Sequence, residues 1–361
     1  MPQLVQSLPP GPLDIIGDIH GEAEALDRLL VRLGVDLDAG TAQRPLIFVG
    51  DLVDRGPDSP AVVWRVRQLV EAGLAWCVAG NHELNLIQGD EKEGNGWAQA
   101  RLEDHYQARG VDGQKVIVPF DSEMAYPEEI EEILAFFRTL PLALVRDDLR
   151  VVHACWDDHA VARIPERADL AWVNRRWTDR IRAELARSGV FEREIEELQR
   201  FAWLKDRDTP PTEDLPNHRE AASRRQSGHP VKVLTSGKEA GVPFEQIFFT
   251  GGKWRVVKRD DWWSRYEDDA AVIVGHYWRR RDGARVDGKP DTWQTPEPYG
   301  WAGPRGNVFC IDYSVGRRFL ERAMGRREGG FDGALAALRW PERELVFDDR
   351  DAPVPTTGWG G

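Results

Sequence analysis

The stretch that decides the fold is LDIIGDIHGEAEALDRLLVRL, residues 13–33. Its first four residues, 13–16, form a mostly apolar run that predicts a buried strand, and leucines recur at helical spacing across residues 22–33. The loop between them, GDIHG at 17–21, carries an aspartate and a histidine between glycines. An order of strand, polar loop and helix is typical of an α/β protein.

The next two segments have the same organisation. Residues 46–49 predict a second strand that runs into GDLVDRG at 50–56, and a helix is expected from about Ser59 to Ala72. Residues 75–79 predict a third strand, which is followed by GNHE at 80–83. Alternating strands and helices of this kind imply parallel strands joined by crossover helices.

The rest of the chain gives a weaker pattern. Strands are expected at 150–153, 231–234, 246–250, 271–274 and 308–311, and helices at 170–188 and 192–203. Residues 335–347 predict a hairpin that turns at Pro341-Glu342. The C-terminal residues 351–361, DAPVPTTGWGG, have no such pattern and are expected to be loose.

The composition is that of a globular protein, since 41% of the 361 residues are hydrophobic and 30% are charged. No run reaches the ~18 consecutive apolar residues that a membrane span requires, and the N-terminus lacks the features of a signal peptide. Three cysteines without CxxC spacing argue against a disulfide framework and favour the cytoplasm. The net charge of −13 disfavours broad nucleic-acid binding, which needs a cationic surface.

Five short motifs follow predicted strands: GDIHG (17–21), GDLVDRG (50–56), GNHE (80–83), VHA (152–154) and GH (275–276). Each motif alone would be an ordinary loop. In open α/β sheets, however, ligand sites form beyond the carboxyl ends of the strands, so the five loops are expected to meet at one edge. The aspartate, asparagine and histidine side chains gathered there suit hard or borderline metal cations.

This set of motifs resembles that of the calcineurin-like metallophosphoesterases, in particular the phosphoprotein phosphatase branch. That branch contains serine/threonine protein phosphatases and symmetrical bis(5'-nucleosyl)-tetraphosphatases. The resemblance implies a four-layer α/β/β/α sandwich of two mixed sheets, formed by residues 1–350 as a single metallophosphoesterase domain. The long interval between His153 and His276 predicts a helical insertion, or lid, at residues 157–270.

The resemblance also implies a site for two divalent metal ions, with Mn expected first and Fe or Zn as alternatives. Asp18 and His20 would bind the first ion, and Asp51 would bridge both. The ligands that complete the second ion would be Asn81, His153 and His276. Two carboxylates leave such a site cationic, so that it attracts phosphate although the chain is acidic. A hydroxide that bridges the two ions would then attack phosphorus.

Three more roles follow from the same resemblance. Arg55 would bind two phosphate oxygens at once through its guanidinium group. His82 resembles the general acid that protonates the leaving oxygen. Asp54 would orient His82 and favour its protonated form by placing a negative charge beside it.

The chain departs from the protein phosphatases in two places. Cys155-Trp156 stands where a glycine pair usually follows the VH histidine, and no arginine between residues 160 and 270 matches the second phosphate-binding arginine of the branch. By contrast, NVFCIDYSVG (307–316) and GALAALRWPERELV (333–346) resemble the closing strands of bacterial tetraphosphatases and small prokaryotic phosphatases. These segments indicate a relationship with the bacterial members of the branch.

Hydrolysis of phosphomonoesters, with Ser/Thr phosphoproteins among the candidate substrates, is the leading functional prediction. Hydrolysis of a dinucleoside polyphosphate such as diadenosine tetraphosphate is the alternative, because the same site can cut an anhydride. A nucleic-acid end phosphatase is disfavoured by the acidic charge. An inactive binding scaffold is disfavoured because the implied ligand set is intact. The expected partners are therefore phosphorylated molecules, with no membrane partner.

Overall fold

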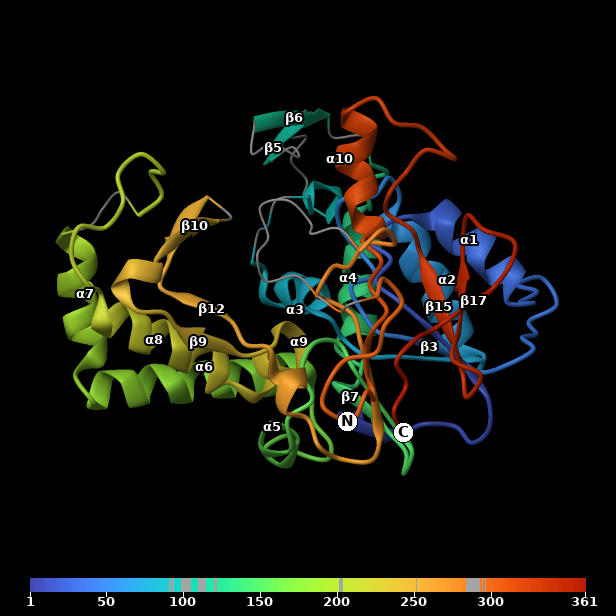
Figure 1. Ribbon diagram of the computed structural model, residues 1–361, viewed down its shortest axis with the longest axis horizontal. Helices are drawn as coiled ribbons and strands as arrows, with labels where there is room; N and C mark the ends of the chain where they lie inside the picture. Colours follow the sequence, from blue (N-terminus) through green and yellow to red (C-terminus); the bar gives the residue numbers. More distant parts are fainter. Residues whose placement is uncertain are drawn as a thin grey trace.

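The computed structural model describes residues 1–90, 92, 94–98, 105–109, 115–119, 122–200, 204–250, 252–283, 293, 295 and 297–361, with 105–109 and 115–119 described as backbone only. Two large sheets form the body of the molecule, and a helical arm extends from this body to the left in Figure 1. Within the described residues, no helix combines the length and the apolar character needed to span a membrane.

The first sheet consists of six strands, in the spatial order β17 (Val354–Pro355), β16 (Glu344–Phe347), β15 (Ala336–Trp340), β2 (Leu13–Ile16), β3 (Leu46–Phe48) and β4 (Ala75–Cys77). β2, β3 and β4 are parallel, and α1 (Ala23–Arg32) and α2 (Ser59–Glu71) connect them. The predicted βαβαβ unit is therefore confirmed. β15 and β16 form the predicted C-terminal hairpin, and β15 pairs antiparallel with β2.

The second sheet consists of five strands, in the order β1 (Val5–Ser7), β7 (Ala143–Val145), β8 (Leu149–Val152), β13 (Ala271–Val274) and β14 (Val308–Cys310). β7 and β8 pair antiparallel, whereas the other neighbours are parallel. This sheet contains the strands predicted at 150–153, 271–274 and 308–311.

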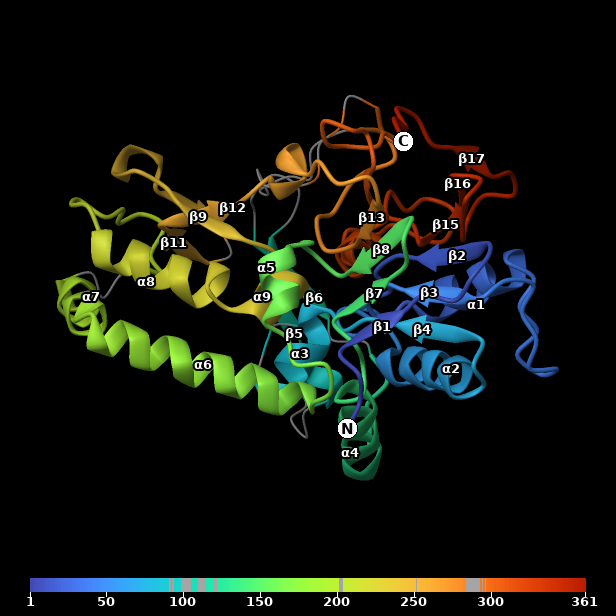
Figure 2. The ribbon, with the colours of Figure 1, turned by 90° about the horizontal axis from the view of Figure 1, so that it is seen from below.

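Side chains alternate between two apolar layers along these strands. In β3, Ile47 belongs to the cluster between the sheets, while Phe48 belongs to the cluster that includes Leu29 of α1 and Val63 of α2. In β13, Ile273 packs between the sheets and Val272 faces the other way, toward the cluster that contains residues of α5 (Asp158–Ala162) and α9 (Pro230–Ser236). Helices thus cover both outer faces (Figure 2), and the predicted four-layer α/β/β/α sandwich is confirmed.

The arm lies within the segment 157–270 and stands out in both views of Figures 1 and 2. Its elements are α6 (Leu170–Arg187), α7 (Val190–Arg200), α8 (Pro216–Ser227), β9 (Glu239–Gly241), β10 (Phe248–Thr250), β11 (Lys253–Arg255) and β12 (Val257–Arg259). Two small apolar clusters, one around Leu185 and one around Leu215, stabilise the arm from within. The arm therefore has a hydrophobic interior of its own.

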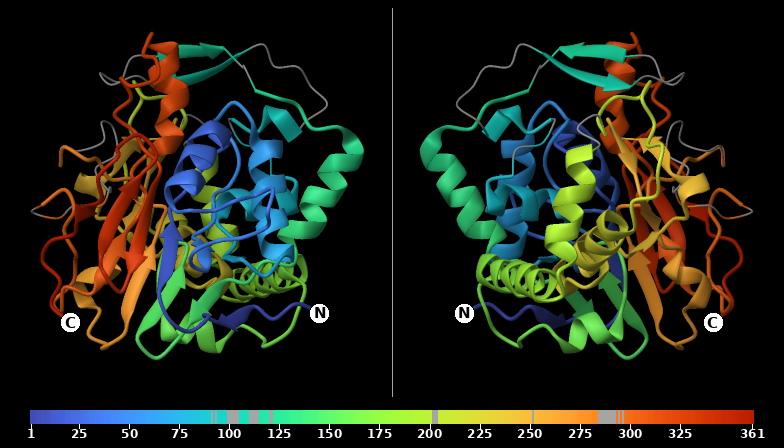
Figure 3. Two further views of the ribbon diagram at one scale, coloured as in Figure 1. Left: turned by 90° about the vertical axis from the view of Figure 1, so that its right-hand side faces the viewer. Right: turned by 90° about the vertical axis from the view of Figure 1, so that its left-hand side faces the viewer.

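Figure 3 shows the remaining elements from two sides. They are α3 (Asn81–Gln88), α4 (Pro127–Phe137), α10 (Arg318–Ala323), the hairpin of β5 (His105–Arg109) and β6 (Lys115–Pro119), and the short 3-10 helices at Gly96–Ala98, Phe244–Gln246, Trp262–Arg265 and Val315–Arg317.

The prediction of a strand at 231–234 is wrong, because these residues lie in helix α9. Pro230 occupies the first helical turn, where its missing N–H costs nothing, and the ring of His229 caps the helix by accepting a hydrogen bond from the N–H of Lys232. Val233 and Leu234 are buried in the body. A short apolar run of this kind has no period of its own, so capping and burial decided its conformation.

The C-terminal residues, which were expected to be loose, are tied to the body. β17 pairs with β16, and the N–H of Trp301 donates to the carbonyl of Thr357. The ring of Trp359 lies 4.5 Å from that of Trp301 and 5.6 Å from that of Trp340, measured between centroids. One aromatic residue in a polar tail thus provides an anchor.

Asp14, in the middle of β2, is buried, and neither of its carboxylate oxygens has a hydrogen-bond partner among the described residues. Burial raises the pKa of Asp14 to about 6, although Arg339 and Arg44 act to lower it. The folded state therefore binds a proton that the unfolded chain releases near pH 4. The free energy of unfolding should consequently fall as the pH rises from about 4 to about 6.

Asp14→Asn is accordingly expected to be more stable than the unsubstituted protein above pH 6, by up to about 3 kcal/mol, because asparagine carries no charge to bury. Below pH 4 the two proteins should be equally stable. Urea unfolding at pH 4 and pH 7.5 measures this difference, with Asp38→Asn on the exposed surface as the control. Equal stability of the two proteins at pH 7.5 would contradict a buried charge at Asp14.

Candidate metal centre

The five predicted loops meet, but at the ends of two sheets and not at the edge of one. Three loops leave the first sheet after β2, β3 and β4, and they carry Asp18, His20, Asp51, Asp54, Arg55, Asn81 and His82. Two loops leave the second sheet after β8 and β13, and they carry His153 and His276. Hydrogen bonds join the two sets: the N–H of His276 donates to Oδ2 of Asp18 (3.0 Å), and Nδ1 of His153 donates to the carbonyl of Val49 (2.7 Å).

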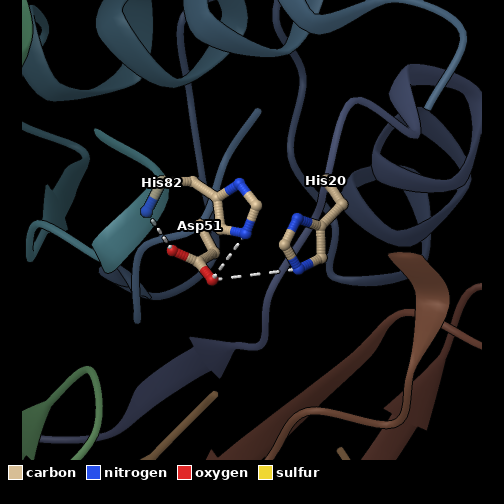
Figure 4. Close-up of side chains that lie close together, drawn as sticks. All are labelled: His20, Asp51 and His82. Carbon is tan, nitrogen blue, oxygen red and sulfur yellow. Dashed lines mark hydrogen bonds and ion pairs between the residues drawn. The ribbon is translucent and has the colours of Figure 1, made fainter. Parts of the chain in front are cut away.

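Asp51 lies at the centre of this cluster. Its Oδ2 atom is 3.2 Å from Nε2 of His153 and 3.8 Å from Nε2 of both His20 and His82. Its other oxygen, Oδ1, accepts a hydrogen bond from the backbone N–H of His82 (3.0 Å). Figure 4 shows the rings of His20 and His82 turned toward this carboxylate. One buried carboxylate oxygen therefore faces three imidazole nitrogens.

In the part of the chain that the structure describes, two groups of side chains have donor atoms close enough to hold one ion each: His20, Asp51 and His82, and Asp51, His153 and His276. Asp51 belongs to both, which is the arrangement that a bridging carboxylate requires. Asn81 adjoins the second group, because its Oδ1 atom accepts a hydrogen bond from Nδ1 of His276 (2.8 Å). The structure thus brings the predicted ligands to one place, but the first group contains His82 in place of Asp18, whose Oδ2 atom accepts from the N–H of His276 instead.

The electrostatics of these residues fit divalent cations. Oδ1 of Asp18 is buried and has no hydrogen-bond partner within the described residues, and burial together with Asp312 holds the pKa of Asp18 well above its usual range. Burial alone would lower the pKa of His153, but Asp51 and Asp18 raise it to about 10. Both groups are therefore favoured with a proton bound. Because a cation can replace such protons and the donors are carboxylate oxygens and imidazole nitrogens, the site suits Mn, Fe or Zn.

His82 forms a chain of hydrogen bonds that points away from the cluster. Its Nδ1 atom donates to Oδ2 of Asp54 (2.6 Å), and the other oxygen of Asp54 accepts from Nε1 of Trp97 (2.7 Å). The hydroxyl of Ser59 accepts from the backbone N–H of Asp54 (2.9 Å). Asp54 is completely buried, so its orientation is fixed, and Nε2 of His82 is the nitrogen that faces the site.

Arg55 reaches into the same space from the loop after β3. Nη1 donates to Nε2 of His20 (2.9 Å) and Nη2 donates to Nε2 of His82 (3.2 Å). The guanidinium carbon lies 5.0 Å from the centroid of the Trp278 ring. The arginine predicted to bind phosphate is therefore adjacent to the candidate ligands.

The backbone of these loops is held in an unusual conformation. His20, Asp51 and His276 have φ values of 48°, 49° and 68°, in the left-handed region that most residues avoid. A Cβ atom at Gly275 would lie 1.9 Å from Oδ1 of Asp18, so only glycine fits beside that carboxylate. The glycines of the motifs therefore allow the ligand side chains to approach one another closely.

Three residues that shape the site were not predicted from the sequence. Glu83 accepts hydrogen bonds from the N–H groups of Asp51 (2.9 Å), Leu52 (2.8 Å) and Gly80 (2.7 Å), so it fixes the loop that carries Asp51. Trp97 fixes Asp54, and Asp312 accepts from the N–H of Trp278 (3.0 Å). Glu83 and Asp312 occur in segments that already stood out, GNHE and NVFCIDYSVG, whereas no pattern marked Trp97.

Comparison with known proteins agrees with this geometry. Residues 11–276 match the family model described as calcineurin-like phosphoesterase, a range that includes every candidate site residue named above from Asp18 to His276. The chain belongs to this family. The resemblance inferred from the motifs is thus confirmed, together with the family's sandwich fold.

Individual relatives match over shorter stretches. A bis(5'-nucleosyl)-tetraphosphatase, described as asymmetrical, from Oceanobacillus iheyensis is 50% identical over 74 residues, which are 19% of this chain and 30% of the relative. A symmetrical bis(5'-nucleosyl)-tetraphosphatase from Ralstonia nicotianae is 45% identical over 83 residues, 23% of this chain and 26% of the relative. Among solved structures, a cold-active protein-tyrosine phosphatase of a psychrophilic Shewanella has a TM-score of 0.47 at 13% identity, covering 98% of this chain and 83% of that one.

Proposed function

We propose that this member of the calcineurin-like family is a metal-dependent phosphoesterase. The observation that carries the proposal is the convergence of three imidazole Nε2 atoms on one carboxylate oxygen of Asp51. Asp18, His20 and Asp51 would hold a first divalent ion, and the residues that would hold a second with Asp51 are Asn81, His153 and His276. Mn is the proposed metal, with Fe and Zn as the alternatives.

When bound, such ions supply Lewis acidity at phosphate oxygens and lower the pKa of water. The side chains of the protein would orient the phosphate group and supply a proton to the leaving oxygen. The guanidinium of Arg55 would bind two oxygens of the phosphate through parallel N–H donors. Nε2 of His82 would give its proton to the leaving oxygen, while Asp54 holds Nδ1 and stabilises the imidazolium form before transfer.

The proposed substrates are phosphomonoesters, including phosphorylated serine or threonine in proteins. A dinucleoside polyphosphate is the second candidate, and the names of the tetraphosphatases from Oceanobacillus and Ralstonia favour it. The cytoplasm is the proposed compartment. Its support is that Cys77, Cys155 and Cys310 are all unbonded and buried, as expected of a protein in reducing surroundings.

Stripping the protein of metal is expected to abolish phosphate release, and adding Mn should restore it, because the proposed reaction needs the Lewis acidity of the ions and the water whose pKa they lower. The measurement is phosphate release from p-nitrophenyl phosphate, a phosphoserine peptide and diadenosine tetraphosphate, before and after metal is restored. Preference for the last substrate would select the second candidate. A protein that binds no divalent ion after Mn is added would refute the proposal.

A further inference from the structure

Within the described part of the chain, the guanidinium group of Arg55 has three contacts in the site, and they differ in the atoms on which they depend. Two are hydrogen bonds to Nε2 of His20 and of His82, and the third is the face of the Trp278 ring. Trp278 comes two residues after His276 and has no role so far: its indole is neither a metal ligand nor an acid or base.

The two histidine contacts depend on nitrogen atoms that the proposed function uses. Nδ1 of His20 donates to the carbonyl of Val53 (3.1 Å), and Nδ1 of His82 donates to Asp54, so Nε2 is in each case the remaining acceptor. An imidazole nitrogen that binds an ion cannot also accept a hydrogen bond, so the bond from Arg55 to His20 would be lost when an ion is bound there. Among the described residues, the indole face of Trp278 is the contact of this guanidinium group that uses no imidazole nitrogen.

The position of Trp278 does not depend on Arg55. The backbone N–H of Trp278 donates to Oδ2 of Asp312 (3.0 Å), and Oδ1 of Asp312 accepts from the N–H of Ser314 (2.8 Å). Asp312 is buried, and its hydrogen bonds hold the turn at Trp278, whose φ of 40° lies in the left-handed region. The backbone that carries the ring is therefore held by contacts that do not involve Arg55.

We propose that Trp278 is a positioning residue for Arg55, which keeps the guanidinium plane over the site so that its N–H donors meet the phosphate group of the substrate. This inference rests on the proposed phosphoesterase function. A cation stacked on an indole face loses rotational freedom before the substrate arrives, so less entropy is lost when the phosphate binds. The effect belongs to phosphate binding and not to proton transfer or metal affinity.

The test compares Trp278→Leu and Trp278→Phe in the Mn-loaded protein. Trp278→Leu should raise KM for p-nitrophenyl phosphate and the Kd of inorganic phosphate by calorimetry, each about 5–10-fold, with kcat within about 2-fold. Trp278→Phe should restore most of the affinity because it keeps an aromatic face. In an Arg55→Ala background, Trp278→Leu should have no further effect on either constant. Metal content by elemental analysis should be unchanged throughout.

The arm offers a matched control, because Trp172 is exposed there and the guanidinium of Arg176 lies 5.2 Å from its ring. Trp172→Leu should leave both constants unchanged. The inference is overturned if Trp278→Leu leaves KM unchanged, if it acts equally without Arg55, or if it lowers metal content, since the last two results would mean that Trp278 acts through the loop of His276. If the unsubstituted protein neither binds phosphate nor hydrolyses the ester, the proposed function itself fails and this inference fails with it.

Discussion

Asp51→Asn is expected to lose both metal ions and to reduce turnover by about 10³-fold or more, which corresponds to several kcal/mol of lost transition-state stabilisation. Asparagine keeps the shape of the side chain, and its Oδ1 atom can still accept from the backbone N–H of His82. Glu83 would still hold the backbone of the loop through the N–H of residue 51. What the substitution removes is the negative charge at the atom on which three histidines converge.

Elemental analysis after Mn loading, together with turnover on p-nitrophenyl phosphate, measures this prediction. Asp38→Asn is a matched control because it removes one carboxylate charge from an exposed position. Thermal unfolding of both variants shows whether either substitution damages the fold. An Asp51→Asn protein that retains two ions per chain would contradict the bridging role, whatever its activity.

The sequence predicted those parts of the fold in which local pattern and burial agree. β2 has the predicted bounds, Leu13–Ile16. A short, mostly apolar run between glycine-containing loops favours a strand that is buried on both faces, and all four residues of β2 are buried. The candidate ligands were predicted for a related reason. Each follows the end of a strand, where ligand sites form in α/β proteins. The ability of aspartate and histidine to bind metal ions is known from the residue type alone.

Contacts between residues far apart in the chain could not be predicted from the sequence. That β8 and β13 form a second sheet depends on pairing between residues more than a hundred positions apart, and no local pattern records it. Trp97 holds Asp54 across an interval of 43 residues. Its neighbours contain no motif, so its role is visible only once the chain is folded. The anchoring of the tail by Trp359 has the same cause.

His82→Ala is expected to separate substrates by their leaving groups. An alkoxide leaving group needs a proton as the P–O bond breaks, so turnover on a phosphoserine peptide should fall about 10²–10³-fold. A p-nitrophenolate group leaves without one, so turnover on p-nitrophenyl phosphate should fall about 10-fold or less. Asp54→Asn should show the same selectivity in weaker form, because Asp54 holds Nδ1 of His82.

The structure also offers His82 a second role, since its Nε2 atom belongs to the group that could hold the first ion. Metal content separates the two roles. A general acid can be removed without loss of metal, whereas a ligand cannot, and loss of the ligand would slow both substrates equally. Full metal content with a selective loss on the phosphopeptide therefore assigns His82 to proton transfer. Reduced metal content with equal losses would assign it to the metal centre and leave the leaving oxygen to be protonated by another group.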